Sequence, residues 1–338
     1  MKKHLLILSF AVLSLFLSGM PAASVVVGST GDPSSIGGGA RPIGMGRAFS
    51  AIADDADAMF INPAGVAAIK GPQAMTMFSN LLEDVYYTEF TGEIPSPYGT
   101  FGLGYFNSAI GNVPTTINST ETVPADYNDS VLVFNYSSPL GRFFEYGRNI
   151  FVGVNYKIFN RGWSGGITDS ATGSNADFGV KYIYNQYLSF GLVRANFIPY
   201  AMGALLKWSG TQESEESFTT LTKVGIAVKP PMPYELNVTM DYDIDLPSVS
   251  GQPNTSHVGL EWKVNKFLAL RGGYEEMPDS NSPTLTTWIP SAGVSLGYDG
   301  FRFDYAYRPF YNNTSLATYY ISLSYIGEPW YALKGETL

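Results

Sequence analysis

Apolar and polar residues alternate with a period of two along most of the chain after Gln73. In the segment 236–245, Leu, Val, Met, Tyr and Ile occupy every second position, and Asn, Thr and Asp occupy the positions between them. A similar alternation recurs at 257–264 and 301–308. Because successive side chains of a strand point to opposite faces, this pattern predicts strands with one apolar face and one polar face.

Fourteen such segments can be placed, and their lengths suit tilted strands that span a membrane. They are expected at 73–82, 85–94, 99–110, 129–139, 149–161, 174–184, 187–197, 217–228, 234–244, 256–264, 267–275, 288–298, 301–309 and 317–326. An even strand number is typical of a bacterial barrel made by one chain. The sequence therefore predicts an all-β fold, a 14-stranded antiparallel transmembrane β-barrel. The alternative is a soluble β-sandwich, which has no need of so many outward Tyr and Phe residues at strand ends.

The composition also favours a barrel in a membrane. Charged residues make up 14% of the 338 residues, whereas an ordinary soluble domain has about 25%. The 23 Tyr, 21 Phe and 5 Trp suit a lipid-facing surface. The formal charge of -9 and the lack of clustered Lys and Arg argue against nucleic acid as a partner. No cysteine is present, so neither a disulfide nor a lipid-modified cysteine is expected.

Residues 1–23 have the pattern of a cleavable signal peptide. An apolar stretch from Leu5 to Leu17 follows two lysines and precedes small residues. No later segment has the roughly 20 consecutive apolar residues of a membrane-spanning helix. We expect four parts, namely the signal peptide at 1–23, a plug at 24–72, the barrel at 73–326 and a periplasmic tail at 327–338.

The connections between the predicted strands are unequal at the two ends of the barrel. Short turns such as Asp299-Gly300 follow even-numbered strands. Long connections follow odd-numbered strands, at 111–128, 162–173, 198–216, 245–255, 276–287 and 310–316, and only the first, 82–84, is short. Bacterial barrels have short periplasmic turns and long outer loops. The asymmetry therefore places both barrel ends in the periplasm and predicts that the plug enters the lumen from that side.

Two short helices are predicted between Gly38 and Gly65. Asn62 is suited to cap a helix over 63–69, and Asp54 or Asp55 is suited to start one that ends at Phe60. Helices this short need surrounding structure to be stable. The aspartates at 54, 55 and 57 lack the spacing of a calcium loop, so capping explains them and no metal site is expected.

The phrases GAR, GMG, AF.A.ADDADA and NPAG, in this order before the strands, resemble the N-terminal hatch of FadL-type outer-membrane transporters for hydrophobic compounds. PorV-like proteins share this architecture. The resemblance implies a small helical plug in the lumen and a part in transport for the NPA tripeptide. The candidate plug and gating residues are Gly44, Gly46, Asn62, Pro63, Ala64 and Gly65. The alternative, that Asn62 only caps a helix, is equally open.

The resemblance also implies that cargo is captured by outer loops and leaves sideways through the wall. The candidate capture residues are Tyr200, Met202, Leu205, Leu206 and Trp208, unless this apolar stretch only extends the seventh strand. The candidate lateral-opening residues are Gly102, Gly104 and Asn107. Glycine permits a strand to bend or break, although it also makes room for a bulky plug. Lumenal cations such as Arg302 are expected to form ion pairs rather than a substrate clamp.

By resemblance, the expected function is passive outer-membrane transport of long-chain fatty acids or other hydrophobic small molecules. The first alternative is a PorV-like barrel that binds or shuttles secreted proteins, and the others are a general pore or a structural barrel. Expected partners are outer-membrane lipid, the barrel-assembly machinery, a fatty acid-like ligand and, in the first alternative, a secreted protein or secretion component. His257 is the only histidine after the signal peptide and no cysteine is present, so neither catalysis nor a cofactor is expected.

Overall fold

The computed structural model describes residues 28–81, 84–117, 121–144, 147–210, 214–231, 237–247, 254–279, 282–310 and 313–329. The predicted signal peptide and most of the predicted tail lie outside these residues. No helix among the described residues is long and apolar enough to cross a membrane.

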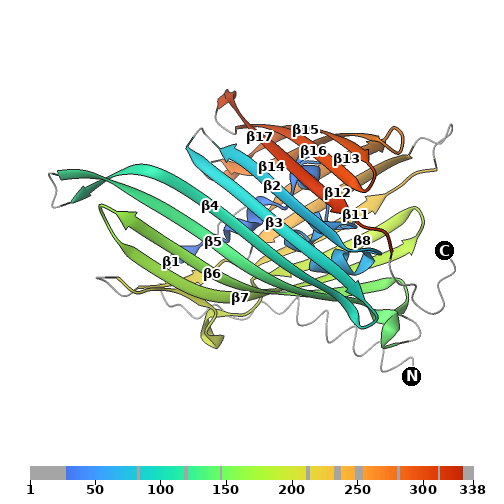
Figure 1. The fold of residues 1–338 in the computed structure, drawn as a ribbon, viewed down its shortest axis with the longest axis horizontal. Helices are drawn as coiled ribbons and strands as arrows, with labels where there is room; N and C mark the ends of the chain where they lie inside the picture. The colour runs from blue at the N-terminus through green and yellow to red at the C-terminus, as the bar shows by residue number, and fades with distance from the viewer. Residues whose placement is uncertain are drawn as a thin grey trace.

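Fourteen antiparallel strands close into a barrel, as predicted (Figure 1). β17 pairs with β2 to close the ring, and β8 pairs with β11. The barrel strands are β2 (Gln73–Leu81), β3 (Val85–Ser96), β4 (Gly99–Ile117), β5 (Glu121–Pro139), β6 (Ile150–Gly165), β7 (Asp169–Asn185), β8 (Leu188–Ala195), β11 (Leu221–Val228), β12 (Asn237–Pro247), β13 (Thr255–Lys263), β14 (Leu268–Asp279), β15 (Ser282–Tyr298), β16 (Phe301–Phe310) and β17 (Asn313–Ile326).

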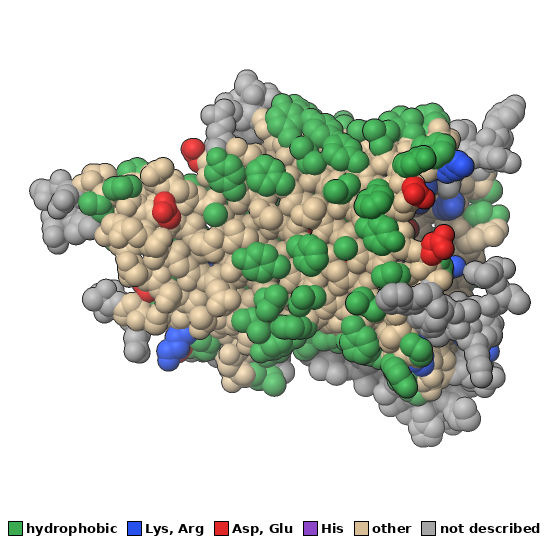
Figure 2. Space-filling model, in the orientation of Figure 1, with side chains coloured by type: hydrophobic (Ala, Val, Ile, Leu, Met, Phe, Trp, Pro, Cys, Tyr) green, Lys and Arg blue, Asp and Glu red, His purple; other side chains and the backbone are tan. Residues whose placement is uncertain are grey.

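The alternation in the sequence becomes an apolar outside and a polar inside. In β13, His257 and Glu261 are buried, whereas Val258 and Leu260 are exposed on the opposite face. Apolar side chains gather on the outer wall over the middle and the right of the view, and few lie over its left end (Figure 2). An exposed apolar wall around a polar lumen is the arrangement of a barrel surrounded by lipid.

The barrel strands are longer at one end than the sequence predicts. We call this the hairpin end, and we call the opposite end, where residues 299–300 join β15 to β16, the turn end. The predicted loops 111–128 and 162–173 are wrong because the β4–β5 and β6–β7 ladders continue through most of them. The same holds for the described parts of 276–287 and 310–316. Backbone pairing continues there without the apolar face that marks a strand within the membrane.

The predicted strand 217–228 is in fact two strands, β10 (Glu215–Phe218) and β11. β9 (Leu205–Trp208) pairs with β7 and β10 and therefore continues the wall beyond β8. Between β8 and β9 lies a short 3-10 helix, η6 (Tyr200–Met202), and another, η4 (Leu140–Arg142), lies between β5 and β6.

Residues 28–72, which we call the N-terminal segment, run through the lumen from one end to the other. β1 (Gly28–Thr30) pairs in parallel with β10 at the hairpin end. The segment continues through η1 (Pro33–Ile36), α2 (Ala40–Gly44), η2 (Ala56–Phe60) and η3 (Pro63–Ala68). It ends at the turn end, where Gly327 N donates to Pro72 O over 2.8 Å. The segment therefore joins the barrel at the turn end, and its described start lies at the hairpin end.

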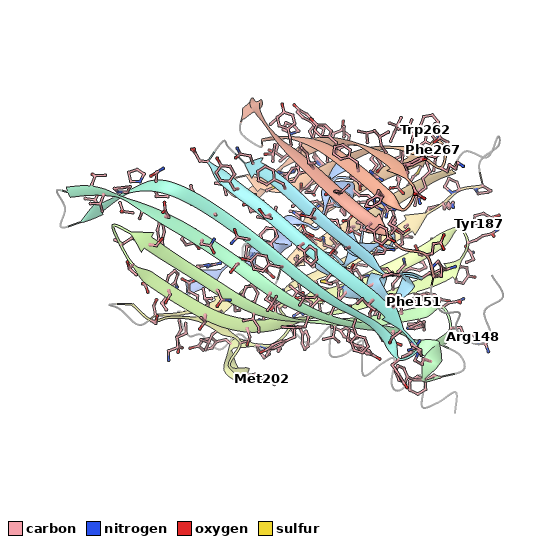
Figure 3. All side chains as sticks on the ribbon, viewed as in Figure 1. Arg148, Phe151, Tyr187, Met202, Trp262 and Phe267 are labelled. Atoms are coloured by element: carbon pink, nitrogen blue, oxygen red, sulfur yellow. The ribbon has the colours of Figure 1, made fainter. Side chains whose placement is uncertain are left out.

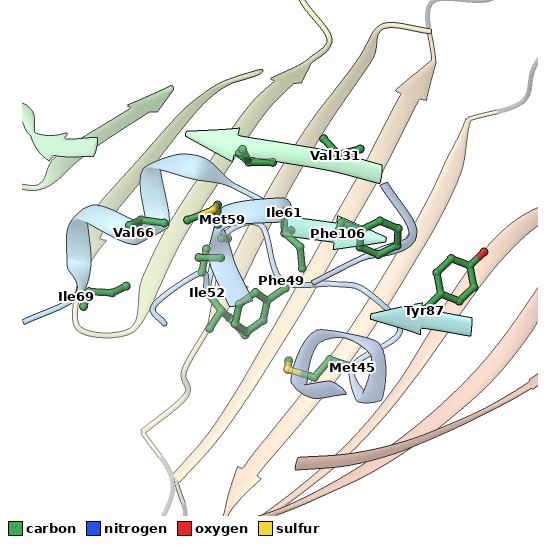
Figure 4. Packing of buried hydrophobic residues seen from close by; sticks show 14 of the residues in the cluster. Met45, Phe49, Ile52, Met59, Ile61, Val66, Ile69, Tyr87, Phe106 and Val131 are labelled. Atoms are coloured by element: carbon green, nitrogen blue, oxygen red, sulfur yellow. The ribbon is translucent and has the colours of Figure 1, made fainter. Parts of the chain in front are cut away.

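The main apolar core lies between the N-terminal segment and the wall (Figure 4). Phe49, Met59 and Val66 of the segment have no exposed surface, and neither do Phe106 and Val131 of the wall. The predicted short helices are present as the 3-10 helices η2 and η3, whose N-caps are Asp55 and Asn62. The segment is too short to form a core alone, so its helices depend on the barrel around them.

Candidate functional site

Asn62 fastens the N-terminal segment to itself and to the wall. Its Oδ1 accepts a hydrogen bond from Ala64 N at 3.1 Å, which caps η3 as predicted. Its Nδ2 donates to Ser50 O at 2.8 Å and to Val180 O of β7 at 3.2 Å. The side chain is fully buried. Asn62 therefore does more than cap a helix, because one amide joins two parts of the segment to a wall strand.

Glycines in the wall allow the N-terminal segment to lie directly against the strand backbones. A Cβ added at Gly153 would lie 2.3 Å from Pro63 O, and one at Gly179 would lie 2.3 Å from Asn62 Oδ1. Both distances are below normal contact, so alanine requires the segment to move. We call the lumenal glycines that touch the segment the glycine belt, and its members are Gly102, Gly104, Gly153, Gly179, Gly191, Gly225, Gly259, Gly273 and Gly293.

Six members of the glycine belt form three cross-strand pairs, which are Gly153 with Gly179, Gly191 with Gly225, and Gly259 with Gly273. Because glycine has no side chain, each pair leaves a shallow recess in the lumenal face of the wall, and the three pairs lie at three places around the ring. Most of these glycines are absent from the site predictions. The signal in the sequence is a glycine at a lumenal position of a predicted strand, but only the closed barrel shows that the positions pair.

Two of the predicted gating glycines, Gly44 and Gly46, meet the wall from the segment side, whereas Gly65 packs within the segment. A Cβ at Gly44 would lie 3.0 Å from Cα of Gly293, and a Cβ at Gly65 would lie 2.5 Å from Ala53 O. Gly46 has a φ of 62°, and a Cβ there would lie 2.6 Å from Tyr274 O. Only glycine fits this conformation and this approach without strain.

Buried ion pairs join the segment to the opposite part of the wall. Arg41 donates to Glu261 of β13 through Nε and Nη2, at 2.8 and 2.9 Å. Arg41 Nη1 also meets Asp55 at 2.5 Å. Arg302 of β16 binds Asp55 at 2.7 Å and Asp57 at 3.1 Å. The predicted ion-pair network is therefore present, and it includes the segment as well as the lumen wall.

The two buried aspartates of η2 and its N-cap have opposite electrostatic surroundings. Burial opposes the ionisation of Asp55, but Arg41 and Arg302 outweigh it and hold the pKa of Asp55 below its ordinary value. Burial and then the charge of Asp55 raise the pKa of Asp57 well above its ordinary value. One carboxyl of this network therefore favours its charged form and the other its neutral form.

Wall carboxylates also bind the backbone of the segment. Asp243 Oδ2 accepts from Phe49 N at 3.2 Å and from Ser50 N at 3.0 Å. Asp241 Oδ2 accepts from Ile52 N at 3.1 Å and from Ala51 N at 3.3 Å. These contacts satisfy four consecutive N–H groups of a stretch that lies outside any helix, so β12 fixes its course.

No protein-family model matches the sequence, and no curated protein is significantly similar to it. Solved structures do share its fold. The toluene transporter TbuX of Ralstonia pickettii aligns with a TM-score of 0.57 and 13% identity over 86% of this chain and 99% of that one. The toluene transporter TodX of Pseudomonas putida gives 0.53 and 12% over 89% and 98%. A FadL homologue of Pseudomonas aeruginosa gives 0.53 and 11% over 86% and 98%.

The fold is that of the FadL-type transporters. The similar structures named above are described as toluene transporters and a FadL homologue rather than as enzymes. At these identities the likeness concerns the FadL-type fold and not the cargo. No group of three or more His, Asp or Glu side chains is arranged to hold a metal ion within the part of the chain that the structure describes.

The structure does not bring the predicted capture residues together on one surface. Leu206 is fully buried in the apolar core that also contains Phe159 and Phe218. Met202 is 73% exposed and points away from the barrel (Figure 3). Of the other predicted residues, Tyr200 donates to Glu215 at 2.6 Å, Trp208 donates to Glu216 at 2.9 Å, and Leu205 is half-buried in β9.

The predicted lateral-opening residues lie in a continuous stretch of wall. Gly102, Gly104 and Asn107 of β4 are paired with both β3 and β5. A Cβ at Gly102 would lie 2.4 Å from Met59 Cε, and one at Gly104 would lie 2.7 Å from Met59 Sδ. These glycines therefore make room for the segment. The irregularity in the β4–β5 ladder lies further on, between Ile110 and Val113.

Two cavities lie on opposite sides of the N-terminal segment. A cavity of about 40 Å³ lies towards the hairpin end, between Phe60, Ile61 and the ion pair of Lys157 with Asp32. A larger cavity of about 200 Å³, the turn-end cavity, lies beside the β7–β8 turn and the end of β11. The segment occupies the lumen between them.

Proposed function

We propose that this protein is a passive outer-membrane channel for hydrophobic small molecules, with the N-terminal segment as its plug and gate. The observation that carries the proposal is the occupation of the lumen by residues of the segment that contact β6, β7 and β13 to β16 at close range. A barrel wall of this size without such a segment would enclose an aqueous channel. A filled lumen suits cargo that gains nothing from a water-filled pore.

The proposal includes an orientation of the barrel in the membrane. The turn end faces the periplasm and the hairpin end faces outward, since barrels of this kind have short periplasmic turns. The parts of the chain are then a signal peptide at 1–23, the plug at 24–72, the barrel at 73–326 and a periplasmic tail at 327–338. Apolar cargo enters near β9 and β10, where Leu206 and Phe218 pack together.

The proposal also includes a lateral exit, through which cargo leaves the lumen sideways across the wall. Its support is the packing of Met59 against Gly102 and Gly104, because movement of η2 would uncover the thin lumenal face of β4. The ladder irregularity at Ile110 and Val113 lies on the same strand. The cargo is a fatty acid or a comparable hydrophobic molecule.

The test compares Asn62→Ala with Asn128→Ala in the purified barrel reconstituted in liposomes. Asn128 is an exposed residue of β5, so its loss leaves the segment untouched. Removal of Asn62 leaves buried groups without their partner, which costs about 1–3 kcal/mol. We expect Asn62→Ala to change the uptake of labelled fatty acid and toluene and to raise the leak of a hydrophilic dye several-fold, with Asn128→Ala like the wild type.

Equal uptake and leak in both variants would remove the gating part of the proposal. If the folded wild-type barrel neither binds nor passes either compound, transport itself is wrong and the protein-binding alternative takes its place.

A further inference from the structure

β3 presents a row of carboxyl groups to the lumen. Glu89, Thr91 and Glu93 occupy alternate positions of this strand, and none of them has exposed surface. η2 packs against β3 and brings Asp57, which is also fully buried, close to the two glutamates. We call Asp57, Glu89 and Glu93 the carboxyl cluster.

Most oxygens of the carboxyl cluster have no hydrogen-bond donor. Both oxygens of Glu93, Oε1 of Glu89 and Oδ1 of Asp57 are buried without a partner among the described residues. Asp57 Oδ2 lies 3.1 Å from Arg302, whereas neither glutamate forms an ion pair within the described ranges. Burial of a carboxylate without donors or an opposite charge is unfavourable, so these two glutamates favour the neutral acid.

The wall beside the two glutamates carries no charge. The cross-strand neighbours of Glu89, Thr91 and Glu93 are Met77, Met75 and Gln73 in β2 and Phe106, Gly104 and Gly102 in β4. Among these six, Gln73 has the only polar side chain, and its Oε1 already accepts from Ala56 N at 3.1 Å. From the N-terminal segment, Asp55 and Asp57 face Glu93 with the same charge as its own. Arg302 of β16, which binds Asp57, also binds Asp55 and Asp304.

The N-terminal segment rests directly on the carboxyl cluster at Gly38 and Gly39. Gly39 N donates to Glu89 Oε2 over 3.1 Å. A Cβ at Gly38 would lie 3.2 Å from Glu89 Oε1, and one at Gly39 would overlap Asp57 Oδ1. Ionised glutamates at this contact need water or an opposite charge, and the segment can admit either only by moving away from β3.

We propose that the carboxyl cluster is a proton-binding site, in which Glu89 and Glu93 hold protons while residues 37–39 lie against β3. A protonated carboxyl group has an O–H donor, and the hydroxyl of Thr91 between the two glutamates can accept it. Loss of the protons frees residues 37–39, so this contact is kept at low pH and loosens as pH rises. A pH-dependent gate follows only where the N-terminal segment is the gate, and that consequence rests on the proposed function.

The experiment compares the double variant Glu89→Gln with Glu93→Gln, whose neutral amides have the shape of the protonated acids, with the wild type in lipid nanodiscs. Glu328→Gln, at an exposed glutamate of the turn end, is the matched control. Infrared spectroscopy at pH 7 records the carbonyl band of protonated carboxyl groups. An exposed glutamate has a pKa of about 4.3 and does not contribute to this band. Hydrogen exchange at residues 37–41 is then compared between the proteins at equal pH, from pH 6 to pH 9.

We expect part of the infrared band to be lost in the double variant and none of it in Glu328→Gln. Opening that releases one proton becomes more favourable by up to about tenfold per pH unit. The wild type and Glu328→Gln should therefore exchange progressively faster than the double variant as pH rises. Titration of the wild-type band, with its exchange followed alongside, gives the same decision if the double variant does not fold.

An infrared band that is identical in the wild type and the double variant would show that both glutamates are ionised and would overturn the site. Exchange with the same pH dependence in both proteins would overturn the release of residues 37–39. Exchange that responds to added calcium and not to pH would assign the cluster to a metal ion instead. No cargo is used, so these outcomes are separate from a failure of the transport proposal.

Discussion

Ion pairs and close packing against glycine both hold the N-terminal segment on each side of the barrel, since glycines of β13 to β15 meet residues 44–46 and Lys157 of β6 pairs with Asp32, but the balance between the two differs. On what we call the charged side, formed by β13, β14 and β16, Arg41 and Asp55 pair with wall side chains of opposite charge, and Asp57 lies 3.1 Å from Arg302. On the glycine side, formed by β6, β7 and β8, Ser50, Asn62 and Pro63 lie against glycine backbones. Attraction between charges depends on their protonation and acts over several ångströms. Close packing is disrupted when a single methyl group is added.

The two kinds of contact differ in how far they allow the segment to move. A contact made by backbone against glycine holds one position, because any added atom would collide. A contact made by long charged side chains tolerates small shifts and responds to pH. We therefore expect residues 50–63 to keep their place on the glycine side when the ion pairs of the charged side are weakened.

The largest effect is expected from Glu261→Gln on the charged side. This change leaves Arg41 and Arg271 buried with less negative charge, and removing one partner from a buried ion pair costs about 3 kcal/mol. We expect a lower melting temperature and faster proteolysis within residues 40–60. Asp299→Asn, which removes one exposed charge at the turn end, is the control. Unchanged melting in Glu261→Gln would show that the charged side does not hold the segment.

A smaller but more local effect is expected from Gly153→Ala on the glycine side. The added Cβ would lie 2.3 Å from Pro63 O and 2.6 Å from Ala64 N, so η3 must move. Overpacking of this kind costs about 2 kcal/mol. Gly272→Ala is the matched control, because a Cβ there meets nothing within 4 Å. In planar bilayers, we expect a larger baseline current for Gly153→Ala and none of this change for Gly272→Ala.

If Gly153→Ala conducts like the wild type, close packing against β6 is not what seals the lumen. The charged side would then carry the seal by itself.

The smallest effect is a pH dependence from Asp57. Burial and the charge of Asp55 raise its pKa well above the ordinary value of 3.8. The folded state therefore binds this proton more tightly than the unfolded state, and stability is lost as pH rises from that value through the folded pKa. We expect the melting temperature of Asp57→Asn to gain on that of the wild type as pH rises from 5 to 8.

The exposed substitution Asp299→Asn serves again as the control, since its difference from the wild type should not vary with pH. A constant difference for Asp57→Asn over this range would mean that Asp57 is ionised throughout.

The alternation of the sequence was sufficient to predict the fourteen barrel strands, because lipid outside and polar groups inside impose a local period of two. Strand ends were less predictable. β4 and β5 continue to Ile117 and from Glu121 respectively, since backbone pairing outside the membrane needs no apolar face. The predicted strand 217–228 failed at residues 219–220, where the wall changes from β10 to β11.

Only part of the candidate site was predictable, because the helix cap is a local feature whereas most of the glycine belt is absent from the site predictions. Asn62 followed by Pro63 identifies a helix N-terminus from local chemistry, and the structure has that cap. Its bond to Val180 O joins residues 118 apart in sequence, so no local pattern indicates it. The predicted capture stretch illustrates the same limit, because the alternation cannot show that Leu206 is buried in the same apolar core as Phe159 and Phe218 while Met202 is exposed.

The sequence by itself determined the strand count, the apolar outer face and the caps of η2 and η3, because each depends on residues within a few positions of one another. Only the tertiary structure decided that the N-terminal segment starts at the hairpin end, that Arg41 meets Glu261, and that Gly153 pairs with Gly179. Those contacts exist because closure of the barrel brings distant strands around one lumen. A period of two says which face a residue occupies, and closure decides what that face meets.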